Sequence, residues 1–165
     1  MTRPRVGVSA CLLGEEVRHD GRHKRSRAVV ELVGPEVDWV AVCPEVEVGM
    51  PVPREPVVLT GEGPRMVGAA TGTDHTDAML RFAEARIAAF APLDGYVLKS
   101  RSPSCGLTGV PGAPGGSGLY AATLRRLCPD LPLAEETALE DDDRRRAFLA
   151  AVHAHRRARQ TSSRP

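Results

Sequence analysis

Three cysteines of this chain stand just after short apolar segments, where an α/β protein would place metal-binding thiols. They are Cys11, Cys43 and Cys105. If the three segments are neighbouring parallel strands, their carboxyl ends meet at one edge of the sheet, where such sheets bind ligands. Three thiolates with no obvious fourth ligand would leave one coordination position open, and an open position favours catalysis over a structural role.

The spacing of these cysteines alone is a weak metal signal. The sequence contains no Cys-x-x-Cys pair and no local iron–sulfur or zinc-finger pattern. The simpler interpretation is that each cysteine is a small buried hydrophobic residue. Their shared position after expected strands favours one common site instead. Cys128, at the end of an expected helix, lacks that position, and we interpret it as a packing residue.

Polar residues close to the cysteines are candidates to act with them. Glu45 follows the second cysteine by two residues in an apolar stretch. A half-buried carboxyl group there can transfer protons, and the alternative is an exposed acid in a loop. The loop 99–106 is rich in hydroxyl groups, and Gly106 would let its backbone approach a bulky centre closely. Lys99 and Ser100 open this loop and face either the pocket or solvent.

The pattern of apolar segments indicates the fold that must position these residues. Short, nearly all-apolar segments are typical of buried parallel strands, and segments of helical periodicity alternate with them. We therefore expect an α/β fold: a single Rossmann-like domain with a mainly parallel sheet and helices on both faces. Strands are expected over 5–10, 39–42 and 95–98 and from 133, and a hairpin over 57–60 and 65–67.

The expected helices follow from apolar spacing and from residues that start or stop a helix. The strongest opens at Thr73 and is stopped by Pro92. In another, Leu124 and Leu127 are expected to point inward. The expected helical ranges are 26–33, 73–91, 119–127 and 137–158.

Length and charge limit the organisation of the chain and its partners. A chain of 165 residues fits one domain. We assign residues 1–140 to the domain that carries the chemistry and 141–165 to a polar, Arg-rich C-terminal helix and tail. The net charge of +1 and an aromatic content of 4% argue against nucleic-acid binding over the whole surface. Basic clusters at 18–27 and in the C-terminal helix are interpreted as solvated faces.

No signal peptide and no apolar segment of membrane-spanning length is recognisable in the sequence. We therefore expect a cytoplasmic protein without a membrane partner. Thiols stay reduced in that compartment, so a group of cysteines there binds a metal or takes part in catalysis more often than it forms disulfides.

Five motifs occur in order along the chain: SACLLG at 9–14, DG at 20–21, CPE at 43–45, PVPR at 51–54 and KSRSPSCG at 99–106. Together they resemble the bacterial thiouracil desulfidase family, formerly catalogued as a domain of unknown function. The similarity runs from about Val6 to Thr137. It implies a [4Fe-4S] cluster held by Cys11, Cys43 and Cys105, with the fourth iron open to the sulfur of a thiocarbonyl substrate.

The resemblance also implies a reaction and the residues that carry it. The family converts a thiolated pyrimidine such as 2-thiouracil to its oxo form and releases sulfide, without net redox. Its acid/base carboxylate falls on Glu45. Its catalytic serine falls in the loop 99–106, where Ser102 is the first choice and Ser100 the second. The residues expected to contact the substrate are Ser9, Lys99, Asp20 and Arg54.

Other functions stay open at this point. The protein is alternatively a zinc hydrolase with three cysteine ligands and a bound water, or a non-enzymatic iron–sulfur or redox module. Within the desulfidase class, a small molecule is favoured by the near-neutral charge, while the Arg-rich C-terminal helix keeps a thiolated tRNA as an alternative substrate. The sequence leaves the oligomeric state open.

Overall fold

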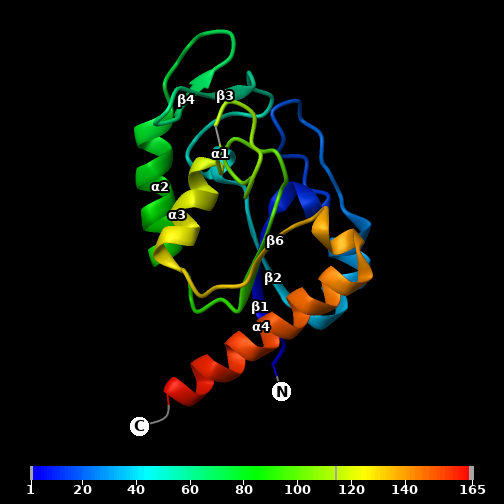
Figure 1. Ribbon diagram of the computed structural model, residues 1–165. Helices are drawn as coiled ribbons and strands as arrows, with labels where there is room; N and C mark the ends of the chain where they lie inside the picture. Colours follow the sequence, from blue (N-terminus) through cyan, green and yellow to red (C-terminus); the bar gives the residue numbers. More distant parts are fainter. Residues whose placement is uncertain (1, 114, 164–165) are drawn as a thin grey trace.

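Four short parallel strands form the central sheet of the computed structural model, which describes residues 2–113 and 115–163 (Figure 1). The strand order is β2-β1-β5-β6, and each neighbouring pair is parallel. This arrangement confirms the expected α/β fold with a mainly parallel sheet. The strands are β1 (Arg5–Ser9), β2 (Asp38–Val42), β5 (Gly95–Leu98) and β6 (Leu133–Glu135).

The order in which strands are added to the sheet reverses between β1 and β5. From β1 it crosses to β2 on one side, and the later strands β5 and β6 add on the other side. The carboxyl ends of β1 and β5 therefore form a topological switch point, where the two flanking connections leave a crevice. Ser9 ends β1, Val42 ends β2 and Leu98 ends β5, so the segments that follow them start at this same edge.

Two helices cover one face of the sheet. They are α2 (Thr76–Ala88) and α3 (Leu119–Leu127), which pack against each other and bury Met79, Leu124 and Tyr120. Tyr120 reaches the sheet, where its hydroxyl lies 3.0 Å from that of Tyr96. A Cβ atom on Gly7 would lie 2.3 Å from the Tyr96 ring, so glycine is needed on β1 for this aromatic packing.

The opposite face is covered by a π-helical turn, Ala28–Val33, and by the long helix α4, Asp142–Ser162. Phe148 and Val152 of α4 are buried in the same apolar cluster as Val8 and Val97 of the sheet. Helices therefore lie on both faces, as expected. The carboxylate of Asp141 accepts a hydrogen bond from the Arg144 amide and caps the first turn of α4.

The remaining elements gather mainly at the carboxyl end of the sheet. A β-hairpin of two strands lies at the top of Figure 1 and confirms the expected one. Gly112 of the long loop after β5 packs against this hairpin, since a Cβ atom there would lie 1.8 Å from the Leu59 carbonyl oxygen. The elements are β3 (Val57–Thr60), β4 (Arg65–Gly68), α1 (Pro44–Glu47) and 3₁₀ turns at Ala10–Leu13, Gly34–Glu36 and Ala138–Glu140.

Several expected boundaries were wrong, each for a local reason. The helix expected from Thr73 begins at Thr76, because the preceding residues pair with β4: the His75 amide donates to the Met66 carbonyl. The short helix α1 was not expected. Leu127 is 41% exposed rather than inward, because it lies in the last turn of α3, at the edge of the core. In the described part of the chain, no helix is both long and apolar enough to cross a membrane.

Candidate functional site

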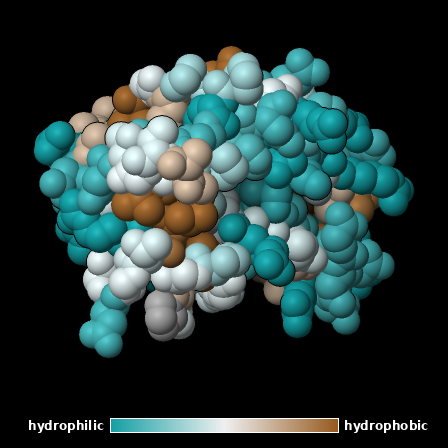
Figure 2. Space-filling view, turned by 90° about the horizontal axis from the view of Figure 1, so that it is seen from above, coloured by the Kyte–Doolittle hydropathy of each residue, from teal (hydrophilic) through white to brown (hydrophobic). Residues whose placement is uncertain are grey.

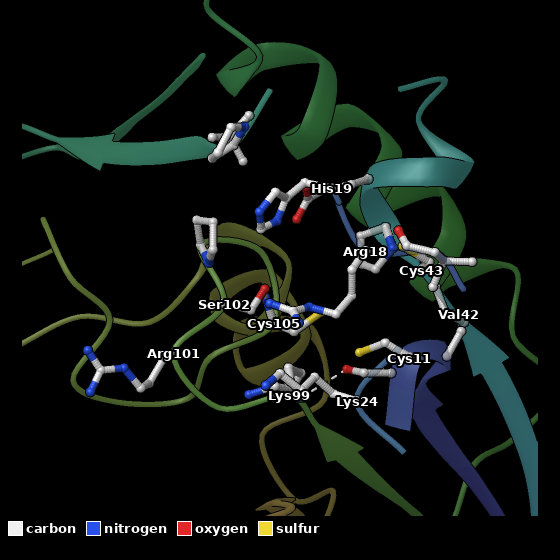
Figure 3. Close-up of a pocket in the computed structure, with 18 of the residues that line it drawn as sticks. Cys11, Arg18, His19, Lys24, Val42, Cys43, Lys99, Arg101, Ser102 and Cys105 are labelled. Atoms are coloured by element: carbon white, nitrogen blue, oxygen red, sulfur yellow. Dashed lines mark hydrogen bonds between the residues drawn. The ribbon is translucent and has the colours of Figure 1, made fainter. Parts of the chain in front are cut away.

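The three cysteines that follow β1, β2 and β5 line one cavity of about 360 Å³ (Figure 3). Cys11 lies in the 3₁₀ turn after β1, Cys43 at the N-cap of α1 and Cys105 in the loop after β5. The cavity lies at the carboxyl edge of the sheet, and its volume falls within the roughly 300–1,000 Å³ of small-molecule sites. The parallel pairing of the strands thus brings together thiols that are far apart in the sequence.

Burial controls the protonation of these thiols. It raises the pKa of Cys11 to about 11, and it raises the pKa of Cys43 and of the buried Cys105 above the ordinary thiol value. For Cys11 the neighbouring Cys43 adds to the rise, whereas the positive charges of Lys99 and Arg18 oppose it. The three thiols are therefore neutral at pH 7, and a metal centre that bound them would release protons.

The donor set suits an iron–sulfur cluster. Soft thiolates are the ligands that hold such clusters. Over residues 2–113 and 115–163, no three His, Cys, Asp or Glu side chains lie close enough together to share a single metal ion. In a cluster each cysteine binds a different iron, so three thiols spread around a cavity fit this kind of centre.

Glu45 is held in a buried ion pair at the edge of the cavity. Its Oε1 atom lies 3.1 Å from Nε of Arg54, and the two side chains are only 14% and 6% exposed. Its other oxygen, Oε2, accepts a hydrogen bond of 3.0 Å from the Ser104 hydroxyl. Arg54 also donates to the Val17 carbonyl oxygen at 3.0 Å. The Glu45 carboxylate is therefore fixed in orientation, and Arg54 contacts it directly.

The two candidate serines differ in what their hydroxyl groups do. Ser102 Oγ accepts hydrogen bonds from the amides of Ser104 and Cys105, at 3.2 and 3.0 Å. Within the described residues its own hydrogen has no acceptor. Ser100 instead donates its hydroxyl hydrogen to Glu136 at 2.6 Å. A hydroxyl group has one hydrogen, so Ser102 is the serine with a proton left for a ligand.

Ser9 and Lys99 join the strands at the switch point. The Lys99 amide donates to Ser9 Oγ at 2.9 Å, which links the carboxyl ends of β1 and β5. The Ser9 hydroxyl lowers the pKa of the Cys105 thiol, against the larger effect of burial, which raises it. Both residues line the cavity, as their sequence positions suggest.

Asp20 lies outside the cavity lining. Its carboxylate accepts a hydrogen bond of 3.0 Å from the Arg22 amide, which is the main cause of its lowered pKa. It also faces Arg18 at 3.9 Å, and Arg18 lines the cavity. The expected contact of Asp20 with a substrate stays a prediction. In the structure Asp20 can affect the cavity through Arg18, which it faces.

Two residues of the cavity lining were not expected from the sequence. The basic cluster at 18–27 was interpreted as a solvated face, but Arg18 and Lys24 line the cavity, and Figure 3 draws both beside the cysteines. The sequence carried a hint of this position, because both residues flank the Asp20-Gly21 motif. Gly106 also has another role: a Cβ atom there would lie 2.4 Å from Cγ2 of Val110, so it serves packing within the loop.

Two basic residues in the second half of α4, Arg156 and Arg159, lie at the other end of the molecule. Arg159 pairs with the buried Asp94 at 2.8 Å, and Arg156 contacts Thr2. These contacts are at the amino ends of the strands, and Figure 1 shows both chain termini there, opposite the β3–β4 hairpin. Seen from the hairpin end, the surface is mostly hydrophilic with a smaller hydrophobic group (Figure 2).

Cys128 packs against the core at the C-terminal end of α3, away from the cavity lining.

Comparisons with known proteins agree with this arrangement. Residues 6–136 match the family described as 2-thiouracil desulfurase. The chain is 36% identical over 108 residues to the uncharacterized protein YbbK of Bacillus subtilis (strain 168), covering 60% of this chain and 71% of YbbK. A solved structure of the [4Fe-4S]-dependent thiouracil desulfidase TudS superposes with a TM-score of 0.67 at 32% identity, covering 84% of this chain and 94% of TudS.

Proposed function

Because this chain belongs to the 2-thiouracil desulfurase family, we propose that it is an iron–sulfur-dependent desulfidase. It converts the thiocarbonyl group of a small thiolated pyrimidine, such as 2-thiouracil, to a carbonyl group and releases sulfide. The observation that carries this proposal is the group of three cysteines around one cavity, with the Glu45 carboxylate in its wall. Water supplies the oxygen and both hydrogens of the hydrogen sulfide released, so the reaction needs no oxidant or reductant.

Cys11, Cys43 and Cys105 are the residues that would hold a [4Fe-4S] cluster in this cavity. When bound, such a cluster supplies an iron with an open position, which acts as a Lewis acid toward the sulfur of the substrate. Three protein ligands and one open position match the general pattern of catalytic rather than structural metal sites.

The chain's own residues provide proton transfer and positioning. Glu45 removes a proton from the water that attacks the carbon bearing sulfur, and Arg54 and Ser104 keep its carboxylate oriented toward the cavity. The hydroxyl hydrogen of Ser102 is uncommitted in the described structure. The proton that the departing sulfur needs comes either from this hydroxyl group or from Glu45, which holds the proton taken from water. The cationic wall formed by Arg18 and Lys99 favours the negative charge that develops on sulfur.

A small molecule is the favoured substrate. The cavity is of ligand size, and the net charge of the chain is only +1. Two of the α4 arginines that made a tRNA substrate attractive, Arg156 and Arg159, form contacts at the opposite end of the sheet. Cytoplasmic location belongs to the same proposal, because the thiols must stay reduced to bind iron.

The proposal is tested by anaerobic purification, reconstitution with iron and sulfide, and incubation with 2-thiouracil. We expect about four iron and four acid-labile sulfide atoms per chain, as a [4Fe-4S] cluster requires, and conversion of 2-thiouracil to uracil with one sulfide released per turnover. Stoichiometric zinc with hydrolysis of another substrate would identify the zinc hydrolase instead. A bound cluster without turnover on any thiolated base would identify the redox module.

Substitutions at the two serines should separate their roles. We expect Ser102→Ala to lower kcat on 2-thiouracil by about 10²-fold, within the range of proton-transfer residues, and Ser100→Ala to lower it clearly less. Ser102→Thr keeps the hydroxyl and should recover most of the loss. Steady-state kinetics at equal cluster content check this. Thermal unfolding shows whether losing the two hydrogen bonds that Ser102 accepts from backbone amides destabilises the protein. A larger loss in Ser100→Ala would exchange the two assignments.

A further inference from the structure

A carboxylate outside all five sequence motifs contacts two residues that line the cavity. We propose that Glu136 is a positioning residue that holds Lys99 and Ser100 in place beside Cys11. Glu136 directly follows β6, and because β6 pairs in parallel with β5, it lies next to the first residues of the loop after β5. Its side chain is only 11% exposed, so its negative charge needs partners inside the protein.

Ser100 and Lys99 are those partners. Glu136 Oε2 accepts a hydrogen bond of 2.7 Å from the Ser100 amide, and Oε1 accepts one of 2.6 Å from the Ser100 hydroxyl. The same Oε1 atom lies 3.0 Å from Nζ of Lys99. The Glu136 amide also donates to the Leu98 carbonyl at 3.4 Å, which ties its backbone to the end of β5. Glu136 therefore binds both residues from a fixed backbone position.

The ammonium group of Lys99 is fully occupied in this arrangement. It has three hydrogens, and three oxygens surround it: Glu136 Oε1 at 3.0 Å, the Ser100 carbonyl at 2.8 Å and Ser100 Oγ at 3.1 Å. Two of these acceptors belong to Ser100, which Glu136 itself holds. Removing the carboxylate would therefore loosen all three contacts and free the long lysine side chain to move.

A fixed ammonium at this place matters for the chemistry of the cavity. Lys99, Ser100 and Cys11 line the same cavity. Positive charge that is already oriented stabilises developing negative charge better than a mobile side chain, because no reorganisation is needed during the reaction. Glu136 thus acts through Lys99 and not on the substrate. The kinetic part of this inference rests on the proposed desulfidase function, whereas the positioning itself does not.

The positioning can be measured without any turnover, because the sequence contains two lysines, Lys24 and Lys99. Lys24 is exposed and belongs to the same cavity lining, so the ratio of the two labels separates a specific release of Lys99 from a general opening of the cavity. We expect an N-hydroxysuccinimide ester to acylate Lys99 several-fold faster in Glu136→Gln than in the unsubstituted protein, relative to Lys24, as read by mass spectrometry. Glu135→Gln is the control: this neighbouring carboxylate is half-buried and contacts Thr108 at 3.4 Å instead. Equal labelling of Lys99 in Glu136→Gln and the unsubstituted protein would overturn the inference.

A double-mutant cycle tests whether Glu136 acts through Lys99. We expect Glu136→Gln to lower kcat on 2-thiouracil by roughly 10- to 100-fold, the usual effect of residues that orient groups in a metal site. The control variant Glu135→Gln should keep normal thermal stability and unchanged activity. Combined with Lys99→Met, Glu136→Gln should cost nothing further, whereas additive losses would refute the positioning role. If the labelling changes as expected but even the unsubstituted protein does not convert 2-thiouracil, the proposed function fails and the positioning stands.

Discussion

Replacing Cys11, Cys43 or Cys105 singly with alanine is expected to abolish iron and sulfide binding, and with it all desulfuration. Each thiol enters the cavity from a different segment at the carboxyl edge of the sheet, so no neighbouring ligand in the same segment can replace a missing one. Iron and acid-labile sulfide per chain, measured after anaerobic reconstitution, should fall from about four of each to a small fraction.

Cys128→Ala is the matched control for this experiment. Cys128 is a half-buried thiol at the C-cap of α3, and it packs against the apolar core away from the cavity lining. Its loss should leave the iron content and the turnover unchanged. Full iron content in any of the three cavity variants, or loss of iron in Cys128→Ala, would show that the ligand set is wrong.

Glu45→Gln is expected to keep the cluster but to lower kcat on 2-thiouracil by roughly 10²- to 10⁴-fold, the contribution typical of a general acid or base. Glutamine preserves the shape of the side chain: its carbonyl oxygen can accept from Arg54, and its amide group can donate to the Ser104 hydroxyl oxygen. The structure favours this change over Glu45→Ala, which would leave a buried guanidinium without its partner at a cost of about 3–5 kcal/mol. Iron content and kcat, measured on the same samples, check the two parts of the prediction.

Glu47→Gln provides the control within the same short helix. Glu47 lies two residues further along α1 and accepts from Nε of Arg86 at 3.0 Å, a pairing much like that of Glu45 with Arg54. It lies outside the cavity lining, so its substitution should leave kcat within about twofold of the unsubstituted protein, as for ordinary surface changes. Equal losses in both variants would point to damage to α1 rather than to proton transfer, and normal turnover in Glu45→Gln would remove its assigned role.

The local pattern of residues was enough to predict the central architecture. The apolar segments at 5–10, 39–42 and 95–98 become strands of one parallel sheet, because a buried parallel strand needs apolar side chains on both faces. The cysteines after them then share one edge, since parallel strands all end on the same side. The short helix α1 was missed, because four residues starting with proline give too little periodicity to detect.

The sequence by itself determined which segments form the sheet and placed the three thiols and Glu45 at its carboxyl edge, because those features follow from hydrophobic periodicity and chain direction. Only the tertiary structure decided which groups pair with each other. Arg54 with Glu45 and Glu136 with Lys99 are contacts between segments that local periodicity does not relate. Such pairs depend on side-chain direction and burial in the packed molecule, where a charge removed from water must find its partner wherever the fold places one.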